Sequence, residues 1–191
     1  MKNFLSVLNV IRLWPHCLLF FLFKRRIIDD LYANDRKQEN IILKFLRLMT
    51  FYKPFRNCFY YRIGVYSFFI KWLASEYDTF IIGRYTPIGY GMNPVHAYAT
   101  IINAKEIGRN FTIFQNVTVG NCSGDKNSIP TIGDDVTIFS NCVVVGNIKI
   151  GNNVKIGAGS IVLKSVPDNC TVVGNPARII KQDGVSVNIQ L

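Results

Sequence analysis

The chain has 191 residues and a formal net charge of +10, and 49% of its residues are hydrophobic. This length is sufficient for one domain, or for one domain with a smaller helical part. The charge is uneven, because residues 1–84 contain 14 Lys and Arg against 6 Asp and Glu, a net +8. A basic excess favours an anionic partner, but no nucleic-acid-binding motif accompanies it, so nucleic acid is not expected. The five cysteines form an odd set without metal-ligand spacing, which favours a reducing, cytoplasmic compartment and no metal site.

The first segment, residues 4–23, is apolar enough to raise the question of a membrane. It is interrupted by Asn9, Arg12, Pro15 and His16, and its longest unbroken apolar run is only Cys17–Phe23. A spanning helix needs about 20 mostly apolar residues. A signal peptide is not expected either, because no small-residue cleavage site precedes the basic residues 24–26. The pattern favours a buried or interfacial helix.

Two further helices are predicted before residue 79. Residues 38–49 place apolar side chains at helical spacing, and Pro54 suits the first turn of a second helix that runs towards Trp72. The buried stripes would be Ile42, Phe45, Leu46 and Met49 in the first helix, and Phe55, Phe59, Ile63 and Tyr66 in the second. Residues 1–78 are therefore predicted to form an α-helical N-terminal part.

A six-residue repeat organises the rest of the chain. Ile or Val recurs at this step, Gly often follows it, and Asn, Asp or Gly stands three residues after it. The repeated positions are Ile101, Ile107, Ile113, Val119, Ile132, Ile138, Val144, Ile150, Ile156 and Val162. β-Branched residues suit strands, and Asn and Gly tolerate the left-handed backbone of tight corners. Three units then close one triangular coil, and parallel coils stack on one apolar interior.

This repeat excludes an amphipathic helix, whose apolar spacing is near 3.6, and leaves a β-sandwich with chance spacing as the alternative. The predicted fold class is mainly β, with a parallel β-helix over residues 79–181 after the helical part. Residues 182–191 are expected to be a frayed C-terminal tail.

Two intervals of thirteen residues break the repeat, and function is expected at such departures. The interval from Ile88 to Ile101 contains His96, and the interval from Val119 to Ile132 contains a projecting loop, Asn121–Pro130. His16, the other histidine, lies in the apolar N-terminal segment, where a structural role is expected. An imidazole changes charge near neutral pH, so His96 is the candidate general base.

Four stretches carry a resemblance to a known family. They are Ile88-Gly89-Tyr90-Gly91, Phe114 to Gly120, Gly157-Ala158-Gly159-Ser160 and Gly174-Asn175-Pro176-Ala177-Arg178. Over residues 80–181 the chain resembles the hexapeptide-repeat acyltransferases, and among them the serine O-acetyltransferases and their relatives in polysaccharide gene clusters. The resemblance implies a left-handed β-helix, a homotrimer or dimer of trimers, and acetyl transfer from acetyl-CoA to a hydroxyl group.

The resemblance also implies roles for particular residues. His96 would deprotonate the hydroxyl. The acceptor would be held by Asn93, Gln115 and Asp125. Acetyl-CoA would lie in a groove between subunits, against small residues at two corners and near three basic side chains: Ser140, Asn141, Ala158, Gly159, Lys164, Arg178 and Lys181.

The chain departs from the serine acetyltransferases at two places. Its projecting loop has no histidine where those enzymes hold the amino-acid acceptor, and Ile81 stands near the place of the acid that orients the base. The acceptor is therefore serine or, as the alternative, a sugar hydroxyl in capsular or exopolysaccharide biosynthesis. A zinc site of the carbonic-anhydrase kind is set aside because it needs three histidine ligands. A non-catalytic scaffold would lack a base such as His96.

The last expectation concerns residues 12–26. Arg12, Lys24, Arg25 and Arg26 border an apolar helix, a combination that favours peripheral contact with an anionic membrane at the inner, cytoplasmic face. A solvated basic face is the alternative.

Overall fold

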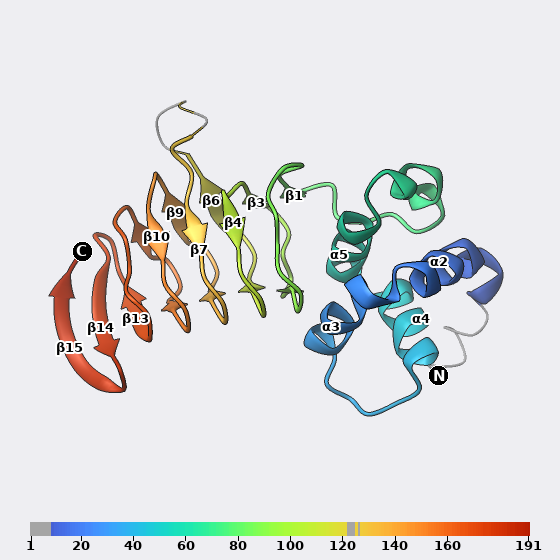
Figure 1. Ribbon diagram of the computed structural model, residues 1–191, viewed down its shortest axis with the longest axis horizontal. Coiled ribbons are helices and arrows are strands. Elements are labelled where there is room, and N and C mark those ends of the chain that lie inside the picture. Colours follow the sequence, from blue (N-terminus) through green and yellow to red (C-terminus); the bar gives the residue numbers. More distant parts are fainter. Residues whose placement is uncertain (1–8, 122–124, 126) are drawn as a thin grey trace. The chain divides into compact units, whose positions relative to one another are not determined.

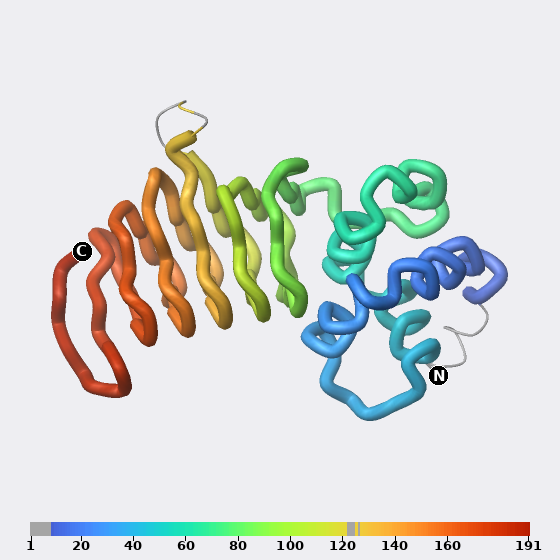
Figure 2. The backbone as a smooth tube through the Cα atoms, in the orientation of Figure 1, coloured from blue at the N-terminus to red at the C-terminus, as the bar shows by residue number. Residues whose placement is uncertain are grey.

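The computed structural model describes residues 9–121, 125 and 127–191 (Figures 1 and 2). The chain forms two compact units. The helical unit comprises Met1–Asp78 and Tyr90–Pro94, and the β unit comprises Thr79–Gly89 and Val95–Leu191. The chain thus leaves the helical unit after Asp78 and returns to it for five residues, which the sequence did not indicate.

The described residues of the helical unit form four α-helices and two 3₁₀-helices. Their bounds are α2 Val10–Leu22, α3 Lys24–Asn34, α4 Ile41–Phe51, α5 Lys53–Ile63, η1 Gly64–Phe69 and η2 Lys71–Leu73, with strand β2 at Asn93–Pro94. The Asn40 side chain caps α4 by accepting from the Ile42 N–H at 2.9 Å. The second predicted helix is shorter than expected, because Gly64 adopts φ +58° and the chain continues as η1. No helix in the described ranges is long and apolar enough to cross a membrane.

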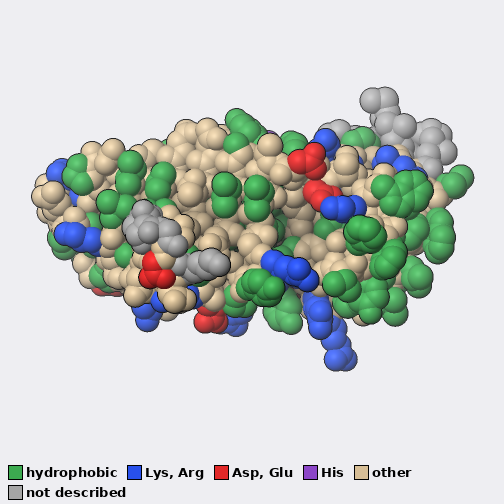
Figure 3. Space-filling view, turned by 90° about the horizontal axis from the view of Figure 1, so that it is seen from above, with side chains coloured by type: hydrophobic (Ala, Val, Ile, Leu, Met, Phe, Trp, Pro, Cys, Tyr) green, Lys and Arg blue, Asp and Glu red, His purple; other side chains and the backbone are tan. Residues whose placement is uncertain are grey.

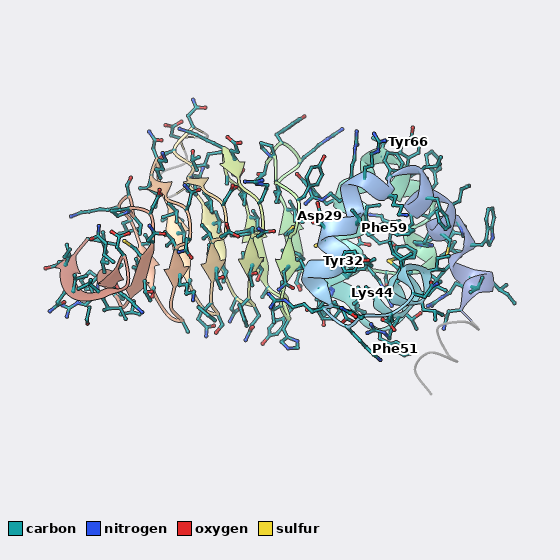
Figure 4. All side chains as sticks on the ribbon, turned by 60° about the horizontal axis from the view of Figure 1, so that its bottom comes forward. Asp29, Tyr32, Lys44, Phe51, Phe59 and Tyr66 are labelled. Atoms are coloured by element: carbon teal, nitrogen blue, oxygen red, sulfur yellow. The ribbon has the colours of Figure 1, made fainter. Side chains whose placement is uncertain are left out.

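An aromatic core holds these helices together. The rings of Phe20 and Phe45 stack with centroids 4.4 Å apart, and Phe45 and Phe59 lie 5.3 Å apart. Two predicted core positions were wrong: Ile42 is 39% exposed and Tyr66 is 50% exposed. The buried face of α4 is centred on Phe45 and Met49, so Ile42 lies at its border, and Tyr66 follows the break at Gly64. Figure 4 shows Phe59 and Tyr66 in this unit.

A fully buried lysine is also part of this unit. Lys44 donates from Nζ to the Asp35 carbonyl oxygen at 2.8 Å, and the same Nζ lies 4.4 Å from the centroid of the Tyr32 ring (Figure 4). A carbonyl dipole and an aromatic face both stabilise an ammonium group, which makes its burial tolerable.

The β unit is a three-sided parallel coil. One sheet contains β1 Phe80–Ile82, β3 Thr100–Ile102, β6 Thr118–Gly120, β9 Val143–Val145 and β12 Ile161–Val162. The second contains β4 Glu106–Ile107, β7 Thr131–Ile132 and β10 Lys149–Ile150. The third contains β5 Thr112–Ile113, β8 Thr137–Ile138, β11 Lys155–Ile156 and β13 Cys170–Val173. From β3 to β12 the chain visits the three sheets in rotation, which confirms the predicted combination of N-terminal helices and parallel β-structure.

The stacking register explains the six-residue repeat. Ile132 pairs with Ile150 and Ile138 with Ile156, so equivalent positions of successive coils meet, and these anchors are buried. The anchor at Ile101 was wrong, because Ile101 is 45% exposed and Ile102 is buried opposite Val119. The step from Ile102 to Ile107 is five residues instead of six, so this coil is one residue short. Because side chains alternate between the two faces of a strand, Ile102 is buried in place of Ile101.

Left-handed residues form the corners, as the repeat indicated. Positive φ occurs at Asn110, Asn116, Asp135, Asn141, Asn153 and Gly159. At the corner before β10, however, Gly146 rather than Asn147 adopts it. Asn side chains also bridge coils, since Asn116 Nδ2 donates to Asn141 Oδ1 at 3.0 Å and Asn153 Nδ2 to Asn169 Oδ1 at 3.0 Å.

The C-terminal residues are ordered in strands, so the expectation of a frayed tail over residues 182–191 was wrong. Strand β14 (Arg178–Gln182) pairs antiparallel with β13, and β15 (Val185–Gln190) pairs antiparallel with β14. A parallel stack ends in a strand with unpaired backbone groups, and this hairpin occupies that edge.

Two glycines show how closely the coils approach. A Cβ atom on Gly108 would lie 2.6 Å from the Gly133 carbonyl carbon and 2.7 Å from the Asp134 nitrogen. A Cβ on Gly133 would in turn lie 2.9 Å from the Gly151 carbonyl carbon. Because real Cβ contacts are longer than this, the corner accepts only glycine, which accounts for the Gly that follows the repeated Ile.

His16 links the stability of the helical unit to pH. It is fully buried in α2, and its Nε2 lies 2.9 Å from the Tyr60 hydroxyl. Burial, together with the charges of Arg12 and Arg56, lowers the pKa of His16 from 6.5 to about 4. The imidazole is therefore neutral in the folded protein under conditions in which the unfolded chain binds a proton.

We predict that acidification destabilises the protein through this residue. The stabilising contribution is complete above pH 6.5 and is lost as the pH falls towards 4, since only the unfolded chain is protonated in that window. The full loss is about 3 kcal/mol. Denaturant unfolding between pH 7 and 4 measures it, and His16→Gln should have a flatter pH dependence. Equal pH dependence of the two proteins would contradict the assignment.

Candidate active site

His96 lies in a short, tightly held loop between β2 and β3. Its backbone adopts φ +50°, and its carbonyl oxygen accepts from the Tyr98 N–H at 2.6 Å. The loop is fixed at both ends. The Val95 N–H donates to Ile113 O at 2.7 Å, and the buried Thr100 hydroxyl lies 3.2 Å from Tyr98 O and 3.1 Å from Phe114 O. The backbone of the loop therefore has one defined conformation while the His96 side chain is exposed.

The imidazole of His96 makes no hydrogen bond or ion pair with any residue in the described ranges. In the sequence, Ile81 stands near the place where the family resemblance leads one to expect the acid that orients the base. Ile81 is 52% exposed in β1, where it pairs in register with Ile101.

The loop after His96 begins a column of corners that runs along one edge of the β unit. The Asn116 N–H donates to Tyr98 O at 3.1 Å, and the Asn141 N–H donates to Gln115 O at 3.2 Å. The Gly159 N–H then donates to Ser140 O at 2.9 Å. We call this edge the corner column; it comprises Tyr98, Gln115, Asn116, Ser140, Asn141, Ala158 and Gly159.

The corner column brings together several residues that the sequence singled out separately. The column begins at Tyr98, two residues after His96 in the chain. It contains Gln115 and the four small or polar corner residues Ser140, Asn141, Ala158 and Gly159. Side chains become smaller along the column, from Tyr98 and Gln115 to Ala158 and Gly159. Three strand spacings of about 4.8 Å separate its first and last corners, so the column is about 14 Å long.

Gln115 is the member of this column with an unsatisfied polar atom. Its Oε1 is buried and has no hydrogen-bond donor in the described part of the chain. Buried polar atoms are nearly always paired, so this oxygen is suited to receive an N–H or O–H group from a ligand or a neighbouring subunit.

The other two candidate acceptor residues are not members of the corner column. Asn93 belongs to β2 of the helical unit. Asp125 is exposed in the projecting loop, where its Oδ1 accepts from the Asn127 N–H at 2.9 Å. Residues 122–124 and 126 of the projecting loop lie outside the described residues.

The three basic candidates for the CoA phosphates are divided between two places. Lys164 shares a small hollow of about 120 Å³ with the Asn175–Ala177 turn. Arg178 pairs with Val173, at the end of β13 from which that turn begins. Lys181 instead lines a separate hollow beside Asn153, Asn169 and Asp183.

A buried ion pair, which the sequence analysis missed, holds the chain immediately before this loop. Asp30 of α3 is 1% exposed and accepts from Arg62 Nε at 2.6 Å and Nη2 at 3.0 Å. Its Oδ1 also accepts from the Gly91 and Met92 N–H groups, each at 2.8 Å. Burial raises the pKa of the Asp30 carboxyl, whereas Arg62 and the two amides oppose this rise.

Two more side chains complete this clamp. Asn34 Nδ2 donates to Met92 O at 2.9 Å, and the Tyr52 hydroxyl donates to Pro94 O at 2.7 Å. Because His96 follows Pro94 by two residues, these contacts restrict the backbone that leads to it. One sequence signal could have found Asp30: it lies with Ile27 and Leu31 at helical spacing, so a carboxylate stands on an apolar face.

Comparison with known proteins identifies the class first. Residues 129–164 match the family described as bacterial transferase hexapeptide (six repeats). The β unit thus has the repeat of the hexapeptide transferases.

Longer matches give the family. The chain is 34% identical to the serine acetyltransferase of Bacillus pumilus (strain SAFR-032) over 187 residues, which cover 91% of this chain and 83% of that protein. The crystal structure of Neisseria gonorrhoeae serine acetyltransferase matches with a TM-score of 0.69 and 29% identity, over 87% of this chain and 67% of that one. A serine acetyltransferase in complex with CoA matches with a TM-score of 0.64 and 27% identity, over 83% of this chain and 69% of that one. The chain belongs to the serine acetyltransferase family.

We predict that Asp30→Asn destabilises the protein far more than the same change at the partly buried pair of Asp35 and Arg47. The substitution leaves the Arg62 guanidinium buried without its counter-charge, at a cost of about 3–5 kcal/mol. Asp35→Asn is the control, because Arg47 keeps its second partner Glu39 and the cost is at most about 1 kcal/mol. Denaturant unfolding measures both, and hydrogen exchange at the Gly91 and Met92 amides should accelerate only in Asp30→Asn. Similar losses in the two variants would contradict the clamp.

Proposed function

We propose that this protein transfers the acetyl group of acetyl-CoA to the hydroxyl of serine, with His96 as the general base. The observation that carries the proposal is the corner column, which links the His96 loop to the small residues at Ser140 and Ala158 through consecutive backbone hydrogen bonds. Membership of the serine acetyltransferase family supports both substrates, since related structures hold serine or CoA.

The reaction needs one proton acceptor, and His96 is suited to that role. The neutral imidazole removes the proton of the hydroxyl, and the oxygen attacks the carbonyl carbon of the thioester. The tetrahedral oxyanion then collapses, the carbon–sulfur bond breaks, and the CoA sulfur leaves with the proton that the imidazolium returns. Backbone N–H groups near the corner are the donors available to stabilise the oxyanion.

The small side chains of the column suit the acyl donor. At Ala158 and Gly159 a pantetheine arm can approach the backbone closely, and Lys164 and Arg178 lie beside the turn near the last corner, where they can bind the phosphates. Lys181 is less suited, because it lines a different hollow. The buried Gln115 Oε1 would accept a hydrogen bond from a bound substrate.

The family resemblance also supports a left-handed coil and a trimer with the acetyl-CoA groove between subunits. Apolar side chains remain exposed on the β unit at Tyr98, Ile101 and Leu163, which are 48%, 45% and 59% exposed. A neighbouring subunit would cover such residues.

A sugar hydroxyl is the second candidate acceptor. The projecting loop of this chain contains no histidine, and Ile81 offers no carboxylate, so two contacts that serine acetyltransferases make are replaced. The discriminating experiment is a thiol-release assay with acetyl-CoA against L-serine and a panel of sugars. Turnover with L-serine supports the proposal, whereas turnover only with sugars assigns the alternative. Absence of thiol release with every acceptor would favour a scaffold.

We predict that His96→Ala lowers kcat by about 10²–10⁴-fold and leaves the Kd for acetyl-CoA unchanged, because a general base acts on the acceptor proton. His16→Gln is the matched control, since it removes the other histidine from the buried part of α2 and should retain kcat. Steady-state kinetics and calorimetric titration with acetyl-CoA provide the measurements. A wild-type kcat in His96→Ala would show that His96 is not the base.

A further inference from the structure

Helix α2 is apolar on two opposite faces. One face buries Leu13, His16 and Phe20 in the core of the helical unit. The other face carries large apolar side chains at helical spacing, each more than half exposed: Ile11, Trp14, Leu18, Phe21 and Leu22. A surface helix normally presents polar residues to water, so this second face is suited to contact with an apolar partner.

The two 3₁₀-helices carry a second group of exposed apolar side chains. Val65, Phe68, Phe69 and Trp72 are each more than two-thirds exposed, and Tyr66 is half exposed. The two groups are joined, because the rings of Phe23 and Tyr66 lie with centroids 5.4 Å apart. Figure 3 shows apolar side chains gathered over the helical unit. We call these two groups together the apolar surface.

Cations border the apolar surface, and acids are missing from the segments that form it. Residues 10–26 contain Arg12, Lys24, Arg25 and Arg26, and residues 64–73 contain Lys71, with no Asp or Glu in either segment. In the described part of the chain, Arg12, Lys24, Arg25 and Arg26 form no ion pair, while Lys71 lies 3.8 Å from Glu76. Four positive charges near α2 thus have no ion-pair partner in the described residues, and the nearest acid in the sequence is the exposed Asp29, one helical turn after Arg25.

We propose that the apolar surface docks on an anionic phospholipid bilayer, with α2 lying in the plane of the interface. Apolar side chains would enter the boundary between headgroups and acyl chains, and the bordering cations would meet lipid phosphates. Trp14, Tyr66 and Trp72 are of the residue types that favour this boundary, where an apolar ring and a polar tip are both accommodated.

The length of α2 determines how the protein would lie. Its 13 residues span about 20 Å, whereas the hydrocarbon core is about 30 Å thick. The helix is too short to cross, and its buried face is already used by the core of the helical unit. Only the outward face is available, which is the arrangement of an in-plane helix.

Charge also favours a bilayer over a second copy of this chain. A two-fold interface brings the same surface of both subunits together. Here it would place two sets of unpaired cations against each other, with no acid in either segment to compensate them. An anionic bilayer instead supplies the opposite charge.

The test is co-sedimentation of the full chain with vesicles of phosphatidylcholine alone, or of phosphatidylcholine with phosphatidylglycerol, at low and at physiological salt. We expect binding to the anionic vesicles that weakens as salt rises, and little binding to the neutral ones. No pelleting with anionic vesicles at low salt would overturn the proposal, and so would equal binding to both compositions.

Paired variants separate the two components of binding. Arg25→Gln with Arg26→Gln should weaken binding to anionic vesicles at low salt by about 30-fold, whereas Lys149→Gln with Lys155→Gln, two exposed lysines of the β unit, should not. Phe68→Ser with Trp72→Ser should weaken binding at least about tenfold, with Tyr85→Ser as the control, because Tyr85 is 88% exposed in the β unit.

Two further measurements keep the outcome clear. Circular dichroism confirms that each variant is folded. If Phe68→Ser with Trp72→Ser does not fold, Arg25→Gln with Arg26→Gln still tests the proposal. Light scattering measures the oligomeric state. If the variants dissociate an oligomer and leave vesicle binding unchanged, a second copy covers the surface and the bilayer proposal is wrong.

Discussion

The constraint on which the β unit depends is the spacing of about 4.8 Å between successive coils. At this distance each residue contacts the residue at the same position of the next coil. The side chains at each position must therefore pack against one another from coil to coil. Ile132 therefore stacks on Ile150, and Asn116 donates to Asn141. At the corner of Gly108 and Gly133 the backbones approach so closely that a single added carbon would clash. The corner column follows from the same constraint, because it places the corner of each coil above the corner of the next.

The parts of the fold that obey this constraint were predictable from the sequence, and those that depart from it were not. A fixed step of six identifies parallel coils because no helix or alternating strand has that period. The shift from Ile101 to Ile102 was not visible, since Thr100, Ile101 and Ile102 are all β-branched and each suits a buried position. The C-terminal hairpin was missed for a related reason: its strands pair antiparallel and follow no six-residue step.

The candidate site divides in the same way. His96 became a candidate because it stands at a break in the repeat, and Gln115, Ala158 and Gly159 because they belong to stretches that resemble the family. The clamp around Asp30 was not, since its partners Arg62, Gly91 and Met92 lie 32 to 62 residues away in the sequence. Burial of a carboxylate without compensation is strongly unfavourable, so its four donors form an interdependent set. This makes Tyr90–Pro94 a rigid starting point for the loop that carries His96.

The chemistry of His96 is the same for serine and for a sugar, but the way in which the acceptor is held must differ. Serine carries an ammonium and a carboxylate group, and each requires an opposite charge or several hydrogen bonds once it leaves water. The corner column offers an amide at Gln115 and hydroxyl groups at Tyr98 and Ser140, and none of its members is charged. A sugar is satisfied by such neutral groups, whereas the ammonium and the carboxylate of serine each require a further charged or hydrogen-bonding group from outside the column. The choice of acceptor therefore depends on residues outside the corner column.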